Sequence, residues 1–241
     1  MINSKDFTEG QLLRVTLKLQ AYIDQPERLQ TQVEDYFKEY DVDKSGNLDR
    51  RELKSFLIDF FKLYKIRVPI TEEFVDTQFD KIDADGDGFV NMDELKSYLT
   101  DFLKTLLLLF NEAISEHPER LIKVDEYTLE ELQVTAKQLE QMNTDPDKLK
   151  AMARDYFDKF DTDKSGAIDM AEMHNLIRGF FTEQGLIIPI DKNFIDDIFV
   201  DLDVDKSGLV EINELVIFYE GLNTILHGMY TAAIERKVTK K

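Results

Sequence analysis

Apolar residues recur along most of the chain at the three- and four-residue spacing that places them on one face of an α-helix. Two clear examples are the sets Val33, Tyr36, Phe37, Tyr40 and Ile195, Ile198, Phe199, Leu202. No stretch alternates apolar and polar residues for long enough to form a substantial strand. The pattern therefore predicts an all-α fold in which β pairing is confined to short contacts between loops.

The second half of the sequence repeats the first. Residues 43–46 and 163–166 both read Asp-Lys-Ser-Gly, which gives an offset of 163 − 43 = 120 positions. The same offset lays Pro69 on Pro189. Pro118 and several charged residues interrupt the helical pattern between the two halves. We therefore predict two domains of one architecture, residues 1–120 and residues 121–241.

Each half is expected to open with an extra helix, over residues 9–23 in the first and residues 129–142 in the second. Both begin at a capping box, in the pairs Thr8 with Gln11 and Thr128 with Glu131. The apolar residues of these helices need a partner surface. The nearest candidates are the groove of the same half and the apolar segment 106–110, so we expect each helix to dock there.

Four acidic segments share a spacing that suits one metal ion each. Ca²⁺ takes six to eight oxygen ligands, and a twelve-residue loop supplies them from positions 1, 3, 5, 7 and 9 and from a bidentate Glu at position 12, with Gly at position 6 for the turn. The first loop offers Asp41, Asp43, Ser45, the Asn47 carbonyl, Asp49 and Glu52. The second offers Asp83, Asp85, Asp87, the Phe89 carbonyl, Asn91 and Glu94. The third offers Asp161, Asp163, Ser165, the Ala167 carbonyl, Asp169 and Glu172, and the fourth Asp203, Asp205, Ser207, the Leu209 carbonyl, Glu211 and Glu214.

The details of these loops favour calcium over magnesium. Each loop ends in Glu, which can offer both oxygens to a large ion, whereas Mg²⁺ prefers fewer protein oxygens in a tighter octahedron. Three loops carry Ser at position 5, which still supplies an oxygen. Position 8 is apolar throughout and should join paired loops by a short antiparallel contact, through Leu48, Val90, Ile168 and Val210. We predict four calcium ions per chain.

The four loops resemble those of the EF-hand superfamily. The resemblance implies two EF-hand pairs in tandem, each preceded by its leading helix. Calmodulin-like proteins join their pairs by a short helical connection, whereas 161 − 94 − 1 = 66 residues separate Glu94 from Asp161 here. The layout is more similar to the ciliate four-EF-hand calcium-binding proteins, and more distant from calmodulin and the calbindins.

The amino-acid composition narrows the range of partners that the protein can be expected to bind. Thirty Lys and Arg against 49 Asp and Glu give a net charge of −19, which argues against nucleic acid or an anionic membrane as the main partner. The sequence has no cysteine, and its longest apolar run, residues 106–110, is far too short for stable insertion into a membrane. We expect a cytoplasmic protein, with association with the cytoskeleton or a cilium as a further expectation.

Three functions fit these observations: a calcium sensor, a calcium buffer, and a calcium-tuned structural subunit of a cytoskeletal or ciliary assembly. Sensors with many targets use flexible, Met-rich grooves, but this chain has only seven Met. A promiscuous activator is therefore less favoured than a buffer or a dedicated sensor. Between these two we favour a sensor with restricted targets, whose partner would be a target helix or a cytoskeletal protein. The three histidines lie far apart and no glycine-rich phosphate loop follows a strand, so we expect no enzymatic activity.

Overall fold

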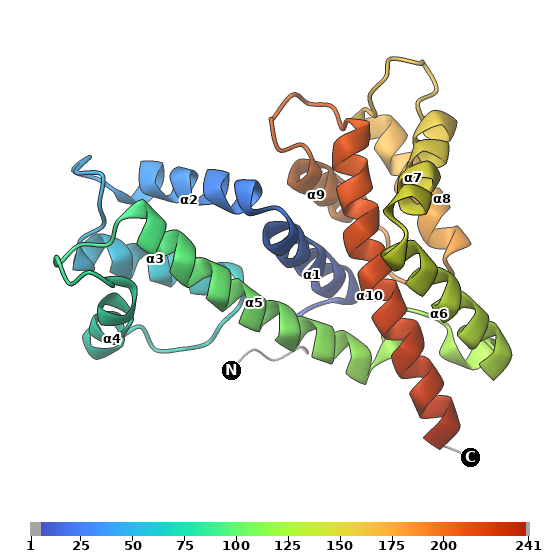
Figure 1. Cartoon of the computed structure of the whole chain (residues 1–241), viewed down its shortest axis with the longest axis horizontal. Helices are drawn as coiled ribbons and strands as arrows, with labels where there is room; N and C mark the ends of the chain where they lie inside the picture. The colour runs from blue at the N-terminus through green and yellow to red at the C-terminus, as the bar shows by residue number, and fades with distance from the viewer. Residues whose placement is uncertain (1–5, 240–241) are drawn as a thin grey trace. The chain divides into compact units, whose positions relative to one another are not determined.

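The computed structural model describes residues 6–239, and these are overwhelmingly helical, as the sequence predicts (Figure 1). The helices of the first half are α1 (Glu9–Asp24), α2 (Pro26–Tyr40), α3 (Arg50–Leu63), α4 (Glu72–Ile82) and α5 (Met92–Glu116). Two short 3₁₀ helices follow, η2 (Pro118–Arg120) and η3 (Val124–Glu126). The second half contains α6 (Leu129–Thr144), α7 (Pro146–Phe160), α8 (Met170–Glu183), α9 (Lys192–Leu202) and α10 (Ile212–Thr239).

The chain forms two compact units, and the division differs from the predicted one at residue 120. Among the described residues, the first unit comprises Asp6 and residues 22–109, and the second comprises residues 7–21 and 110–239. The boundary therefore lies within α1 and within α5. Most of the first leading helix belongs to the second unit.

The first unit is built from two helix–loop–helix segments, α2 with α3 and α4 with α5. Asp49 caps α3 in a full capping box and the Thr71 side chain caps α4, so the sequence itself marks where these helices begin. Aromatic rings fill the core. Phe60 lies 5.6 Å from the ring of Phe102, and Phe61 stacks on the same ring at 5.6 Å. This core joins the exit helices of both loops.

In the second unit the leading helix α6 docks on its own half, as predicted. It packs along α10 and also contacts α7, and its residues Leu132 and Leu139 are buried. The buried amide of Asn223, on α10, donates to the Leu139 carbonyl at 2.9 Å and to the Asn143 side chain at 2.6 Å. These hydrogen bonds fix α6 against the helix that leaves the fourth loop.

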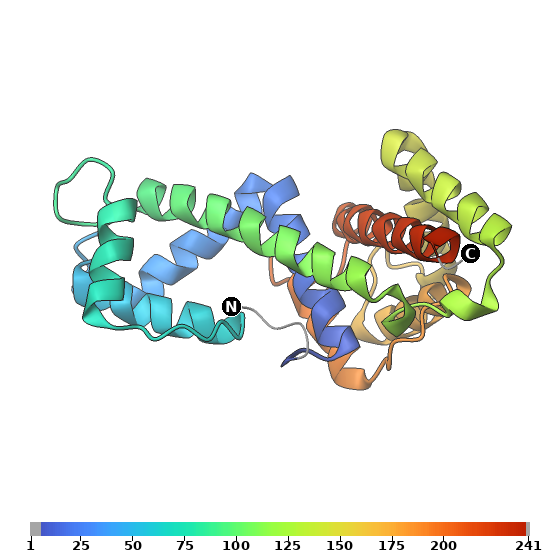
Figure 2. The same ribbon diagram turned by 90° about the horizontal axis from the view of Figure 1, so that it is seen from below.

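The prediction that α1 docks on the groove of its own half is wrong. Residues 7–21 pack on α9 and α10 in the second unit, where α1 is seen beside α10 in Figure 1 and beside the orange α9 in Figure 2. Arg14 pairs with Asp197 at 2.9 Å and with Asp201 at 2.7 Å, and Lys18 also reaches Asp201, at 2.8 Å. These ion pairs are the physical reason why α1 docks on the second unit. The other leading helix, α6, cannot form them.

The ends of the second unit are held by local contacts. The ring of Phe7 meets that of Phe110 edge to face at 5.1 Å, which gives the apolar segment 106–110 one of its partners. Near the basic end of the chain, Arg236 pairs with Glu119 at 2.9 Å and Lys237 donates to the Tyr127 carbonyl. Lys240 and Lys241 lie outside the described residues. Between residues 6 and 239, no helix is both long and apolar enough to cross a membrane.

The contact between Asn223 and α6 can be tested by substitution. Asn223→Leu introduces the residue that the first half has at the matching position, Leu103, and removes both hydrogen bonds while it keeps the number and branching of the side-chain heavy atoms. We expect a loss of about 1 kcal/mol in the stability of the α6 contact. Hydrogen exchange should show it as roughly fivefold faster exchange of the α6 amides.

Asn143→Ala is the matched control, because it removes only one of the two hydrogen bonds and lies at an exposed position. It should change α6 exchange less than Asn223→Leu does. Equal exchange in the wild type and in Asn223→Leu would show that apolar packing alone holds α6.

Candidate metal centres

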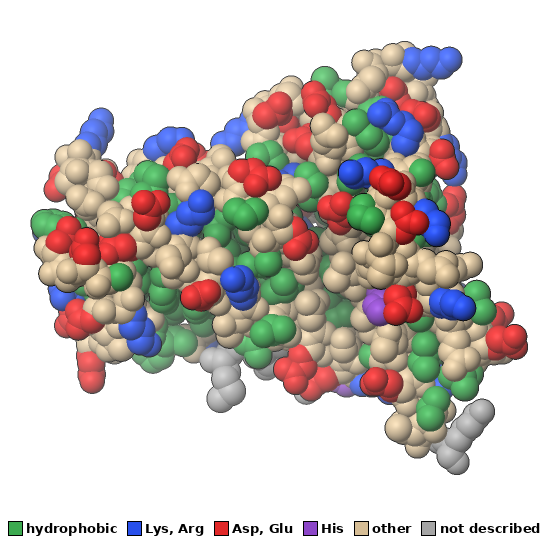
Figure 3. Space-filling model, viewed as in Figure 1, with side chains coloured by type: hydrophobic (Ala, Val, Ile, Leu, Met, Phe, Trp, Pro, Cys, Tyr) green, Lys and Arg blue, Asp and Glu red, His purple; other side chains and the backbone are tan. Residues whose placement is uncertain are grey.

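Each of the four loops gathers three carboxylates around one point. In every loop, oxygens from positions 1, 3 and 12 lie within 4.8 Å of one another. The four sets are Asp41, Asp43, Glu52; Asp83, Asp85, Glu94; Asp161, Asp163, Glu172; and Asp203, Asp205, Glu214. In Figure 3 acidic side chains cluster over the loop between α4 and α5. Three carboxylates this close repel one another, and a divalent cation with oxygen preference would relieve that repulsion.

The Glu at position 12 belongs to the loop and to the exit helix at once. In the second loop, one oxygen of Glu94 accepts from the Ala84 amide at 2.9 Å and the other accepts from the Asn91 amide at 2.9 Å. Glu52, Glu172 and Glu214 make the same pair of bonds in their loops. Both carboxylate oxygens are therefore directed back over the loop, as a bidentate ligand requires.

The side chain at position 1 organises the turn. In the first loop, the two oxygens of Asp41 accept from the amides of Ser45, at 2.9 Å, and of Gly46, at 2.8 Å. The third and fourth loops repeat these bonds, and in the second loop Asp83 accepts from Asp87 and Gly88. The loop is thus shaped by its own acidic residues.

The serine at position 5 places its hydroxyl beside the carbonyl of position 7. The Ser45 hydroxyl donates to the Asn47 carbonyl at 3.0 Å, which brings the oxygens of positions 5 and 7 side by side. Ser165 and Ser207 make the same bond to the carbonyls of Ala167 and Leu209. In the second loop, Asp87 instead accepts from the Phe89 amide at 2.8 Å.

The side chain at position 9 caps the exit helix in three of the four loops. Asp49, Asn91 and Asp169 cap the exit helices by accepting from the amide of the residue at position 12. Glu211 is longer, and in its loop the bond runs only from its own amide to Glu214, at 3.1 Å. The three-carboxylate clusters are formed by positions 1, 3 and 12, and a ligand role for position 9 stays a prediction.

The loops are joined in pairs by single β-bridges at position 8, as predicted. Leu48 and Val90 exchange backbone hydrogen bonds of 2.8 and 3.0 Å, and Ile168 and Val210 exchange bonds of 2.8 and 2.9 Å. All four side chains are fully buried. Each pair of carboxylate clusters is therefore linked through a rigid contact that reaches the core.

Position 4 holds a feature that the sequence analysis missed. Lys44, Lys164 and Lys206 have φ values of 58 to 59°, in the left-handed region that side chains with a Cβ disfavour. In the second loop the same position is Gly86, at φ 72°. The glycine at one of four equivalent positions was the available signal that this position needs a left-handed backbone.

The electrostatic state of the acidic groups follows from their surroundings. The hydroxyl and amide of Ser45 lower the pKa of Asp43, and Ser165 and Ser207 do the same for Asp163 and Asp205. Burial raises the pKa of Glu214, and the nearby Asp203 and Asp205 add to the effect, although its bonds to the Glu211 and Val204 amides oppose it. A cation bound among these groups would favour their charged forms.

A comparison with known protein families covers the regions of all four loops. A family model described as an EF-hand domain pair matches residues 30–100 and again residues 150–220. The two matches contain the four loops and cover more than half of the chain. A search of curated proteins found no match.

The role of the position-12 carboxylate can be tested in the second loop. Glu94→Gln removes a negative charge and one of the two strong ligand oxygens. We expect the calcium affinity of that loop to fall by at least about tenfold, because even outer-shell changes weaken metal sites by roughly 10- to 100-fold. Isothermal titration calorimetry would measure the loss. Asp93→Asn is the matched control, since it makes the same charge change at the adjacent exposed residue, and affinity as low as in Glu94→Gln would refute the assignment.

Proposed function

The chain belongs to the EF-hand family of calcium-binding domain pairs, and from this premise we propose that it is a calcium sensor with a restricted set of targets. The observation that carries the proposal is the position of the Glu at position 12 of each loop. This residue is part of the carboxylate cluster and also lies in the first turn of the exit helix. Movement of its carboxylate toward an ion therefore moves the helix.

The exit helices carry the aromatic core of the first unit. Glu52 is followed on α3 by Phe56 and Phe60, and Glu94 is followed on α5 by Phe102. The rings of Phe60 and Phe102 are in contact, so the two helices cannot turn independently. A calcium-driven change in either loop would rearrange this apolar surface, which is the physical requirement for a sensor.

For the unit that contains α6 and α10, one observation favours another candidate function, that of a calcium buffer. There α6 covers its own half and is hydrogen-bonded to α10 through Asn223. If α6 stays docked, calcium binding leaves little new surface exposed. We therefore propose that target binding is mainly a property of the first unit.

We also propose that the chain binds four calcium ions through the 24 predicted ligand groups, and that it has no enzymatic activity of its own. Four carboxylate clusters support the ion count, and membership of a family that is typically not enzymatic supports the second statement. The cytoplasmic location and a cytoskeletal or ciliary association remain predictions from the sequence.

Native mass spectrometry in excess calcium tests the ion count. We expect four bound ions, because each loop offers the same three-carboxylate cluster. Two bound ions would mean that some loops, for example those with Ser at position 5, do not bind.

Calcium titration of 8-anilinonaphthalene-1-sulfonate fluorescence tests the sensor. Fluorescence should rise with calcium and return to its starting value with chelator, because the dye reports newly exposed apolar surface. The variant Glu52→Gln/Glu94→Gln should lose most of this rise, whereas the matched variant Glu172→Gln/Glu214→Gln should keep it. A flat signal in the wild type, with calcium bound, would instead support the buffer.

A further inference from the structure

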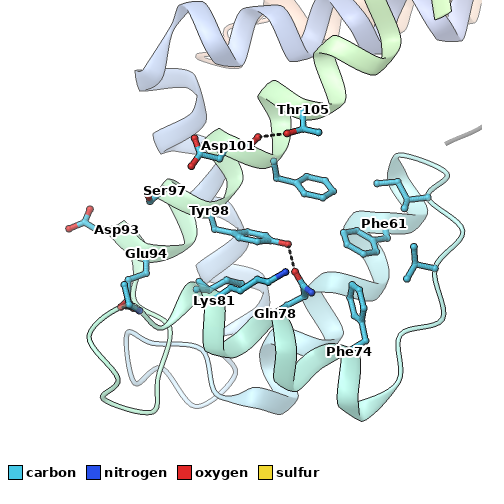
Figure 4. Close-up of a pocket in the computed structure, with 15 residues that line it drawn as sticks. Phe61, Phe74, Gln78, Lys81, Asp93, Glu94, Ser97, Tyr98, Asp101 and Thr105 are labelled. Carbon is cyan, nitrogen blue, oxygen red and sulfur yellow. Dashed lines mark hydrogen bonds between the residues drawn. The ribbon is translucent and has the colours of Figure 1, made fainter. Parts of the chain in front are cut away.

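The first unit has an apolar groove at the side of α4 and α5 (Figure 4). It has a volume of about 770 Å³. Phe61 and Phe74 meet edge to face at 5.8 Å, and Tyr98 stacks on Phe102 at 5.9 Å. The Tyr98 hydroxyl donates to Gln78 at 3.0 Å, and its pKa is raised to about 12 by burial. The walls are thus preformed by packed aromatic side chains.

The internal repeat shows what this surface holds in the other half. At the offset of 120, Phe61 and Phe74 correspond to Phe181 and Phe194, which also meet edge to face, at 5.9 Å. There α1 lies against Phe194. A Cβ placed on Gly10 would be 3.1 Å from the Phe194 ring and 3.6 Å from Ile188, which corresponds to the groove residue Val68.

Two further positions of the α1 seat also correspond to groove residues. Asp201, which binds Arg14 and Lys18, corresponds to Lys81, and Gly221, which lies beside Leu17 and Gln20, corresponds to Asp101. Both Lys81 and Asp101 line the groove. The groove is therefore the repeat-equivalent of a surface that already binds a helix.

We propose that this groove binds an amphipathic helix of a partner protein that carries an acidic residue facing Lys81. The assignment rests on the proposed target-binding function and specifies where the target binds and what its chemistry is. Lys81 is exposed and, among residues 6–239, forms no ion pair, so its charge is available to a partner. Figure 4 shows its side chain lying beside Tyr98, along the groove.

Charge argues against α1 of a second copy as the occupant. In the second unit the two cations of α1 face Asp197 and Asp201, but the corresponding residues of the first unit are Thr77 and Lys81, of which Lys81 lines the groove. Lys18 would then meet a like charge, which disfavours that pairing. The aromatic pair is retained while the charge at the position of Asp201 is reversed in Lys81, so the groove is suited to a helix with a different charge at that point.

The seat of α1 also gives the register of the target. Its contact residues Gly10, Arg14, Leu17 and Lys18 are spaced i, i+4, i+7 and i+8, which is one face of a helix. A small residue should face Phe74, as Gly10 faces Phe194. An acidic residue eight positions later should face Lys81, and a basic residue two positions further should face Asp101.

The test uses the full chain and two fluorescein-labelled peptides with the sequence of residues 7–24. One peptide is native, and the redesigned one carries Arg14→Gln, Lys18→Glu and Gln20→Lys to match the groove. Fluorescence anisotropy is measured in calcium and in chelator. We expect the redesigned peptide to bind in calcium about tenfold more tightly than the native peptide, since a repulsion is replaced by exposed attractive pairs.

Charge reversal in the protein provides the site-specific readout. Lys81→Asp restores the acidic residue of the second unit, so it should weaken the redesigned peptide and strengthen the native one. Lys62→Asp is the matched control, because both lysines are exposed and lie in the last turn of their helices, and Lys62 does not line the groove. It should leave both affinities unchanged.

The outcomes separate this assignment from the proposed function. Native peptide that binds as tightly as the redesigned one would overturn the charge argument and indicate a second copy of the chain. No binding of either peptide, with a calcium-dependent dye signal, would overturn the groove assignment and leave the sensor standing. Binding that responds to Lys81→Asp but is equal in calcium and chelator would support the groove and contradict the sensor.

Discussion

Repulsion among closely spaced carboxylates is the constraint on which the molecule depends. Each loop holds three carboxylates within 4.8 Å, and the backbone amides of the same loop hold them there. Hydrogen bonds from the Ala84 and Asn91 amides to Glu94 show how the backbone of the loop holds this charge in place. Because Glu94 also lies in the first turn of α5, a change in the charge of the loop acts directly on the position of that helix.

The two units share one architecture but differ in the helices that pack against it. In the second unit, α6 and α1 both pack against α10, and polar contacts from Asn223 and Asp201 secure them. In the first unit, the corresponding residues are Leu103 and Lys81, neither of which can make those contacts. Duplication has thus produced one unit that binds helices from within the chain and one whose matching groove has different charge.

Local features could be predicted from the sequence because their causes lie within a few residues. The loop spacing, the capping box at Thr128 and the pairing of Leu48 with Val90 all follow from such short-range rules. The seat of α1 could not be predicted in this way, because the repeat suggested that both leading helices behave alike. The signal lay in their differences, since Arg14 and Lys18 correspond to Val134 and Gln138 in α6.

The single bridge between paired loops has a consequence for how steeply the protein responds. Leu48 and Val90 share two backbone hydrogen bonds, so an ion that orders the first loop also orders part of the second. The second ion then loses less conformational entropy on binding, which is positive cooperativity without any further contact. Ile168 and Val210 give the other pair the same property. Each pair should fill over a narrower range of calcium concentration than two independent loops would, so that it behaves as a threshold.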